Sequence, residues 1–427
     1  MTPTYTTALY QRILTELNAV SVIDCHEHLQ RESELPQGAD IHIGRFFIHY
    51  ANCDLVSAGM PVQDMTHVQT DPNLSPRERF RFIAPWYRKA WNTGYCEAVR
   101  IAIRDLYGFE DLTEESVEPL TEAMCSAIRP GYTRQVFDRA GIDLAMNNPF
   151  GPNLVYNPDF GRDCFRCDMT ADSLTEFPIL RIAEETGIDI LCLDDYLKAI
   201  DWYFERYASQ ASALKVGRAY DRSLYFEDVA KSAAEPIFNR INAASMLNQQ
   251  PGRAEIQTLE DFILHYLCRK CGEYGLRMKF HTGLQEGYGN LITNSRAALM
   301  ANLFLKYPKT GFDIYHISYP YQDELATLAK NFANVTVDFC WMWIINPAAG
   351  RRALSEMLDA VPANKLHGFG GDFIFVEGTY AHVKMARREI ARVLCEKVEE
   401  RRFSEDYALE VGRMLLRQNA LDNFNLS

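Results

Sequence analysis

The chain lacks the features of secreted, membrane-spanning and nucleic-acid-binding proteins. It has no run of about 18 apolar residues that could span a bilayer. Residues 1–25 lack the basic segment and apolar core of a secretory signal. The 57 acidic residues outnumber the 44 basic ones, and the net charge of −13 repels phosphate backbones. We therefore expect a cytoplasmic protein that binds neither membranes nor nucleic acid.

A disulfide framework is not expected either. The chain has 11 cysteines, an odd number, and at 427 residues it can build a core without covalent staples. Two Cys-x-x-Cys pairs, Cys164 with Cys167 and Cys268 with Cys271, stand roughly a hundred residues apart, whereas a zinc ribbon needs about 15–20 between its pairs. These cysteines are interpreted as packing residues.

Short apolar runs alternate with helical patterns along the chain, and this alternation is typical of parallel βαβ units. The runs cover residues 19–25, 142–148, 163–169, 212–217, 276–283, 310–318, 334–340 and 365–372. Eight such units favour a closed (β/α)₈ barrel. A glycine-rich dinucleotide fingerprint is absent after the first run, which argues against an open doubly wound sheet. The sequence thus predicts an α/β fold in which residues 1–427 form one barrel domain.

Residues 30–130 form a long insertion after the first strand. The segment is too long for a plain loop, so we expect a mostly helical subdomain. It should emerge at the C-terminal face of the barrel, where barrel active sites lie. It could form a lid or pocket wall, to which His42 and His49 could contribute, or a packing layer or an interface in a homo-oligomer. The tail, residues 404–424, predicts a C-terminal helix packed on the outside.

The strongest chemical signal is the motif Asp24-Cys25-His26-Glu27-His28 at the end of the first strand. Side chains at i and i+2 of a strand share one face, so both histidines can point into the barrel mouth. Three more ionisable residues end later strands: His281 the fifth, His316 the sixth and Asp372 the eighth. Imidazole and carboxylate groups are common zinc ligands. This ordered set predicts a divalent metal centre.

The ordered set resembles the amidohydrolase superfamily of metal-dependent (β/α)₈ barrels. The resemblance implies one divalent cation, expected to be zinc, and a catalytic role for His316. The ligands that it implies are His26, His28, His281 and Asp372. It also implies that Asp372 takes a proton from a metal-activated water and returns it to the leaving group. The predicted enzyme is a hydrolase of an amide, ester or lactone bond in a small carboxylate-bearing metabolite.

The fourth strand bears on the number of metal ions, because two-metal members of the superfamily bridge their ions with a carboxylated lysine there. Lys215 stands close to that position. The same stretch also resembles a Lys-x₃-Ala-Tyr-x-Arg pattern of a single-metal branch, which includes the amidohydrolase-like domain of glutamine-synthetase-like proteins. In that branch Lys215, Tyr220 and Arg222 would line the substrate pocket, where a guanidinium fork suits a carboxylate. We favour one cation.

Two other reactions on the same barrel remain open, a metal-dependent lyase (decarboxylase) and a uronate-type aldose–ketose isomerase. Uronate isomerases share the ligands of the first, fifth and eighth strands and the long insertion. Their eighth strand continues from Asp into Ser-Arg, whereas Asp372 is followed by Phe373 and Ile374, which argues against sugar isomerisation.

Three further residues near strand ends have two interpretations each. Lys279 is either a charge partner deeper in the barrel or purely structural. Trp341 and Trp343 form either an aromatic pocket wall or part of the core, and core packing is the interpretation we favour.

Overall fold

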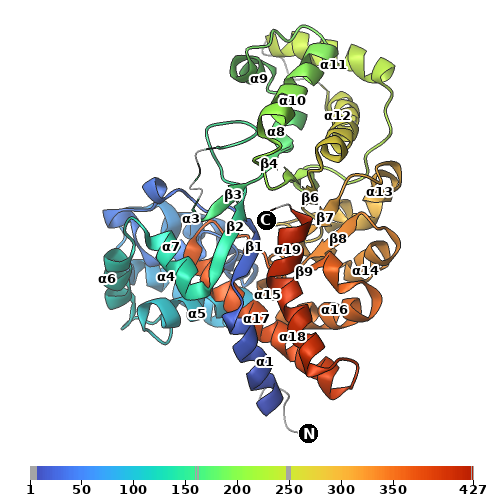
Figure 1. Ribbon diagram of the computed structural model, residues 1–427. Coiled ribbons are helices and arrows are strands. Elements are labelled where there is room, and N and C mark those ends of the chain that lie inside the picture. The colour runs from blue at the N-terminus through green and yellow to red at the C-terminus, as the bar shows by residue number, and fades with distance from the viewer. Residues whose placement is uncertain (1–6, 159, 161–162, 247–251, 425, 427) are drawn as a thin grey trace.

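The computed structural model describes residues 7–158, 160, 163–246, 252–424 and 426 (Figure 1). Its strands are β1 (Val22–Glu27), β2 (Ile142–Asn147), β3 (Phe165–Cys167), β4 (Met169–Thr170), β5 (Leu214–Val216), β6 (Met278–Phe280), β7 (Phe312–Ile314), β8 (Val335–Asp338) and β9 (Leu366–His367). Each falls inside one of the eight predicted runs or overlaps it. β3 and β4 together form the third barrel strand, which is interrupted at Asp168, so β5 to β9 are the fourth to eighth.

All neighbouring strands pair in parallel, in the order β1-β2-β3 and then β4 to β9. The segment after β9 closes the ring on β1. The Asp372 N–H donates to the His26 carbonyl at 2.8 Å, and the His28 N–H donates to the Phe373 carbonyl at 3.0 Å. Every residue of β1 and of β5 to β9 is buried, because helices cover the outside and side chains fill the inside. The predicted (β/α)₈ barrel is confirmed.

Helices surround this ring, with α3 to α7 on the left of Figure 1 and α10 to α12 at the top. The α-helices are α1 (Ala8–Ala19), α2 (Ala51–Ser57), α3 (Val62–Thr70), α4 (Pro76–Ala90), α5 (Gly94–Tyr107), α6 (Val117–Ala127), α7 (Tyr132–Ala140), α8 (Asp172–Thr175), α9 (Ile179–Thr186), α10 (Leu193–Tyr207), α11 (Lys231–Met246), α12 (Arg253–Tyr274), α13 (Ala301–Lys306), α14 (Gln322–Asn331), α15 (Met342–Ile345), α16 (Pro347–Ala360), α17 (Val376–Glu399), α18 (Glu405–Arg413) and α19 (Asn419–Asn423). Among the described residues, no helix is both long and apolar enough to cross a membrane.

The insertion at 30–130 is mostly helical, as predicted, and contains α2 to α6. Its α5 packs on α17 and on α15, so the insertion is joined to the barrel through buried apolar faces. The buried residues of α5 recur at helical spacing and include Val99, Ala102 and Ile103.

The tail forms a helix packed on the outside, as predicted, because α18 packs on α17 and α1, but the chain continues further. After α18, its last turns reach under the barrel, where Ala420 and Phe424 pack against Ile23, Cys25 and Met146 from the strands. Apolar residues at the end of the tail gain more burial inside the ring than on its surface. The C-terminal segment therefore closes the end of the barrel opposite the strand C-termini.

The four cysteines of the two Cys-x-x-Cys pairs are buried and free of disulfides. Cys268 and Cys271 lie on α12 inside the apolar core, which agrees with their interpretation as packing residues.

Candidate active site and metal centre

The two histidines of β1 converge on one point at the C-terminal end of the barrel. His26 Nε2 lies 3.2 Å from His28 Nε2. Asp24 holds the backbone of His26 in place, because the Asp24 Oδ1 accepts the His26 N–H at 3.1 Å. The His28 ring is oriented by Nδ1, which donates to the Asn148 carbonyl at 2.7 Å. Since a carbonyl only accepts, the proton of neutral His28 is on Nδ1 and the lone pair of Nε2 points into the site.

The carboxylate of Asp372 completes this group. Its Oδ1 is 3.4 Å from His26 Nε2 and 3.5 Å from His28 Nε2. Asp372 has a φ of 60°, which is left-handed and rare for a residue with a Cβ. Such strain concentrates at functional sites, where the surrounding structure enforces it.

Two acids of the β1 motif hold the backbone on both sides of Asp372. Asp24 Oδ1 accepts the Gly371 N–H at 3.0 Å, and Glu27 Oε2 accepts the Phe373 N–H at 2.7 Å. A Cβ at Gly371 would lie only 1.8 Å from Glu27 Oε1, so glycine is required there. Burial, together with the neighbouring Asp24 carboxylate, raises the pKa of Glu27 well above its usual value.

His281 and His316 form the other half of the site. His281 Nε2 donates to the Leu284 carbonyl at 2.9 Å, and His316 Nδ1 donates to the Cys340 carbonyl at 3.0 Å. The remaining nitrogens, His281 Nδ1 and His316 Nε2, face one another at 3.0 Å. His316 Nε2 is also 3.7 Å from Asp372 Oδ2. Like Asp372, His316 has a left-handed φ of 60°.

All four histidines are held neutral. Burial is the main cause, and the nearby Lys215 ammonium adds to it, so the pKa of His28 falls to about 3 and that of His26 well below its usual value. The pKa of His281 is also lowered well below its usual value, and burial lowers that of His316 to about 3. Burial raises the pKa of Asp372 to about 7, although Lys215 opposes this.

The donor set fits a divalent cation. Neutral His281 and His316 present lone pairs to each other, an arrangement that is repulsive unless a cation lies near both. His26 Nδ1 is buried without a hydrogen bond, 3.7 Å from Asp168 Oδ2. Neutral imidazoles with one carboxylate are the ligand types that zinc prefers. His26, His28 and Asp372 form the tighter group, while His281 is turned toward His316.

A cavity of about 860 Å³ opens above these residues and is lined by His28, His281 and Asp372. Lys215 and Tyr220, both predicted to bind substrate, also line it. Lys215 lies on β5 and is only 5% exposed. The Tyr220 ring lies 4.7 Å from the His281 ring, and its hydroxyl accepts the Glu286 N–H at 3.1 Å.

Arg222, the third predicted substrate-binding residue, faces away from the cavity. Its guanidinium is 2.8 Å from Glu260 and 2.6 Å from Asp261, both on α12, and it also donates to the Tyr225 carbonyl at 2.9 Å. Arg218 likewise pairs with Glu260, at 2.8 Å. Since buried acids on α12 occupy both guanidinium groups, the expectation that Arg222 binds a substrate carboxylate is corrected.

The insertion contributes to the cavity wall through His49 and Tyr50. Their rings lie 3.8 Å apart, and the Tyr50 hydroxyl donates to the Asp372 carbonyl at 2.5 Å. Burial lowers the pKa of His49 to about 3. His42 does not line this cavity.

Sequence reasoning missed several cavity residues that lie shortly after the ends of strands. Phe150 follows β2, is 80% exposed and stacks on the His28 ring at 5.2 Å. Asp172, the first residue of α8, and Glu286, in the loop after β6, supply further carboxyl groups. No spacing pattern marks these residues; their one shared signal is a position shortly after a strand.

Lys279 and the two tryptophans have structural positions. Lys279 Nζ forms a buried ion pair with Asp168 at 2.9 Å, deeper in the barrel. Trp343 is buried and donates to the Gly368 carbonyl at 2.8 Å. Trp341 is buried behind the site, with its ring 4.4 Å from Tyr50 and 5.1 Å from His316.

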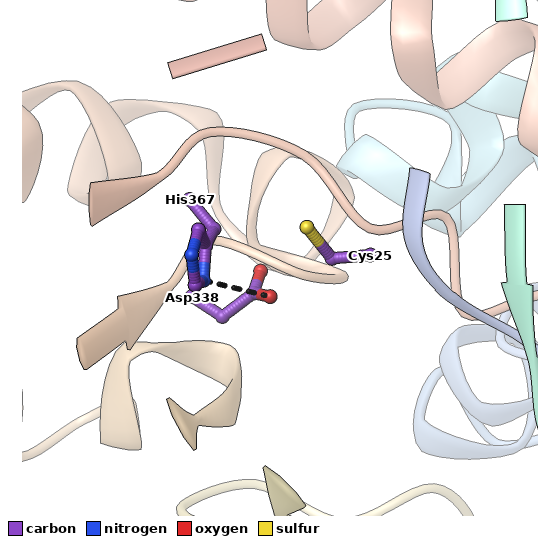
Figure 2. Close-up of side chains that lie close together, drawn as sticks. All are labelled: Cys25, Asp338 and His367. Atoms are coloured by element: carbon purple, nitrogen blue, oxygen red, sulfur yellow. Dashed lines mark ion pairs between the residues drawn. The ribbon is translucent and has the colours of Figure 1, made fainter. Parts of the chain in front are cut away.

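A second polar cluster, drawn in Figure 2, contains Cys25, Asp338 and His367 inside the barrel. His367 Nδ1 donates to Asp313 Oδ1 at 2.9 Å, and its Nε2 accepts from the Asn423 amide at 3.1 Å. Burial and the adjacent Asp313 raise the pKa of Asp338 well above its usual value. Both imidazole nitrogens of His367 are thus engaged in hydrogen bonds with Asp313 and Asn423, inside the barrel core.

Comparisons with known proteins agree with the barrel fold. The uronate isomerase of Thermotoga maritima superposes with a TM-score of 0.80 at 15% identity, covering 98% of both chains. The glucuronate isomerase of Caulobacter crescentus superposes with a TM-score of 0.77 at 17% identity, covering 98% of this chain and 94% of the other. Likenesses at this level of identity show the shared fold.

Two sequence matches were also found. Protein fluG of Emericella nidulans is 26% identical over 144 residues, which are 34% of this chain and only 16% of that protein. Residues 166–426, from β3 to the tail, match the amidohydrolase family. This match covers more than half of the chain, including Lys215, His281, His316 and Asp372, and the chain therefore belongs to the amidohydrolase family, whose members are metal-dependent enzymes.

Proposed function

We propose that this protein is a metal-dependent hydrolase of an amide, ester or lactone bond in a small carboxylate-bearing metabolite. One observation carries the proposal. The Asp372 carboxylate lies within 3.4–3.7 Å of nitrogens from His26, His28 and His316, with a cavity above them. We propose that His26, His28, His281 and Asp372 hold one divalent cation, with zinc favoured. A cation bound there supplies Lewis acidity, which makes water more acidic and polarises a carbonyl oxygen.

The residues of the chain have distinct roles in this scheme. Asp372, whose carboxylate faces the nitrogens of His26 and His28, takes a proton from the attacking water and returns it to the leaving group. His316 Nδ1 is committed to the Cys340 carbonyl, so its Nε2 accepts and orients the water. Lys215 and Tyr220 bind substrate in the cavity, and the 30–130 insertion, through His49 and Tyr50, forms part of its wall.

Sugar isomerisation on the same barrel is the second candidate. It is favoured by the fold shared with two uronate isomerases and by Tyr50, whose hydroxyl lies beside Asp372. Asp372 would then move a proton along the substrate without consuming water.

Heavy-oxygen water separates the two reactions. The metal-loaded protein would be screened against N-acyl amino acids, lactones and acidic sugars, and the product analysed by mass spectrometry. Hydrolysis places one solvent oxygen in the product. Conversion of D-glucuronate to a ketose without incorporation during the catalytic step would replace the hydrolase proposal with the isomerase.

A further inference from the structure

Lys215 is the buried cation of the cavity. Its side chain is 5% exposed and borders the same space as His28 and His281. Within the described part of the chain, no carboxylate lies within ion-pairing distance of Lys215 Nζ, and the ammonium forms no hydrogen bond with a protein group. Asp172 lines the same cavity but forms no ion pair with Lys215. Both of its carboxylate oxygens lie 3.0 Å from the Gly217 N–H, which they accept. A largely buried ammonium that faces the cavity without a carboxylate partner favours an anionic ligand.

This ammonium lies beside the metal-binding set. Its charge contributes to the lowered pKa values of all four site histidines and acts on Asp372 as well. Lys215 Nζ lies 5.2 Å from the centre of the Tyr315 ring, and that ring is 4.8 Å from the His26 ring. Lys215 and the metal-binding residues therefore share the floor of the cavity.

The other cations are placed differently. Arg181, on α9, also lines the cavity, but it is exposed and donates to the Pro152 carbonyl at 3.0 Å. Arg218 and Arg222 are held by acids of α12. Among the described residues that line the cavity, a carboxylate at the floor can thus pair with Lys215, whereas a carboxylate at the solvent side can pair with Arg181.

We propose that the substrate carries its carboxylate within three bonds of the reacting carbon, as in N-acyl α-amino acids and esters of α-hydroxy acids. The inference rests on the proposed function, since it assumes that the reacting oxygen is held by the His/Asp set. A ligand that reaches this set and Lys215 together must have its two oxygen-bearing groups close in the covalent structure. In an aldose–ketose isomerisation, the reacting carbons of a uronic acid lie at the opposite end of the sugar chain from its carboxylate. With those carbons at the His/Asp set, the carboxylate would lie toward Arg181.

Two isomeric ligands test the inference without any reaction. Calorimetry with zinc-loaded protein would compare α-hydroxybutanoate and γ-hydroxybutanoate, which have the same composition and charge, with D-glucuronate as a third ligand. We expect the α isomer to bind at least about tenfold more tightly than the γ isomer. Lys215→Met should weaken its binding about 30-fold or more, with unchanged zinc content, because a desolvated charge partner is lost. Arg181→Met, the matched control, should leave its affinity unchanged.

Several results would overturn the inference. They are equal binding of the two isomers, tighter binding of glucuronate that depends on Arg181, and no binding of any of the three ligands to zinc-loaded protein. Loss of a second zinc equivalent in Lys215→Met would instead assign Lys215 as a bridging ligand. A failure of the wild type to retain any zinc would overturn the proposed function itself, so the two failures can be told apart.

Discussion

His281 Nδ1 and His316 Nε2 face one another at 3.0 Å, and each histidine donates its other nitrogen to a backbone carbonyl. Both facing nitrogens therefore carry lone pairs while the rings are neutral. Two backbone carbonyls thus fix the tautomers from outside the site and keep both rings poised for an electrophile.

The metal content follows from this arrangement. Protein purified without added metal should hold about one divalent ion per chain, since one carboxylate serves the histidine set. His26→Asn should lower the occupancy, because it removes a ligand within 3.4 Å of Asp372. Elemental analysis checks both expectations. Two equivalents would favour the bridging role of Lys215, and a chelator-treated protein that kept full activity would contradict a metal mechanism.

Replacing the proton-transfer group should separate chemistry from metal binding. Asp372→Asn keeps an oxygen toward the histidines but cannot act as the base, so kcat should fall at least about 100-fold. Part of the metal should remain, because the imidazoles are unchanged. Asp323→Asn, at an exposed position on α14, is the control for an Asp-to-Asn change. Nearly full activity of Asp372→Asn would refute the assigned role.

Arg222 should behave as a structural residue. Arg222→Met leaves Glu260 and Asp261 partly unpaired in a buried setting, so the free energy of unfolding should fall by about 3–5 kcal/mol. The exposed pair of Arg240 and Glu255 offers a control, since Arg240→Met should change stability by less than about 1 kcal/mol. Denaturant unfolding measures both. Unchanged stability together with weaker carboxylate binding would restore the substrate-binding interpretation of Arg222.

Asp172 should make stability depend on pH. Burial raises its pKa from the ordinary 3.8 to about 6. Between about pH 4 and pH 6 the unfolded chain has released this proton while the folded protein retains it, so rising pH destabilises the fold. Asp172→Asn lacks this titration, and its stability relative to the wild type should increase by about 1–3 kcal/mol across that window. Parallel stability curves for the two proteins would contradict the assignment.

Glycine at position 371 should be essential for the Asp372 geometry. Gly371→Ala places a Cβ within 1.8 Å of Glu27 Oε1, so the loop or the glutamate must move and the alignment of Asp372 with His26 is lost. We expect lower metal affinity in a zinc titration of the folded variant. Gly252→Ala is the control, because the nearest side-chain atom to its Cβ is 3.7 Å away. Unchanged zinc affinity in Gly371→Ala would show that the clamp of Asp24 and Glu27 does not position Asp372.

The sequence by itself determined the barrel and the identity of the residues at its strand ends. Short apolar runs between helical patterns predicted the strands, because strands buried on both faces are largely apolar. The i, i+2 spacing of His26 and His28 fixed their common direction, since that depends only on the pleat. His281, His316 and Asp372 could be added because the C-terminal ends of parallel strands meet at one face.

The tertiary structure alone decided which groups the charged side chains near the C-terminal face of the barrel contact. Arg222 and Lys215 are seven positions apart in one predicted pocket motif, yet acids on α12 bind the guanidinium, while Lys215 faces the cavity. The tail passes under the barrel, and the insertion carries His49 and Tyr50 to Asp372, over distances in sequence that no local pattern encodes. Long-range packing selects these partners, because a long flexible side chain pairs with whichever buried charge the fold brings within reach.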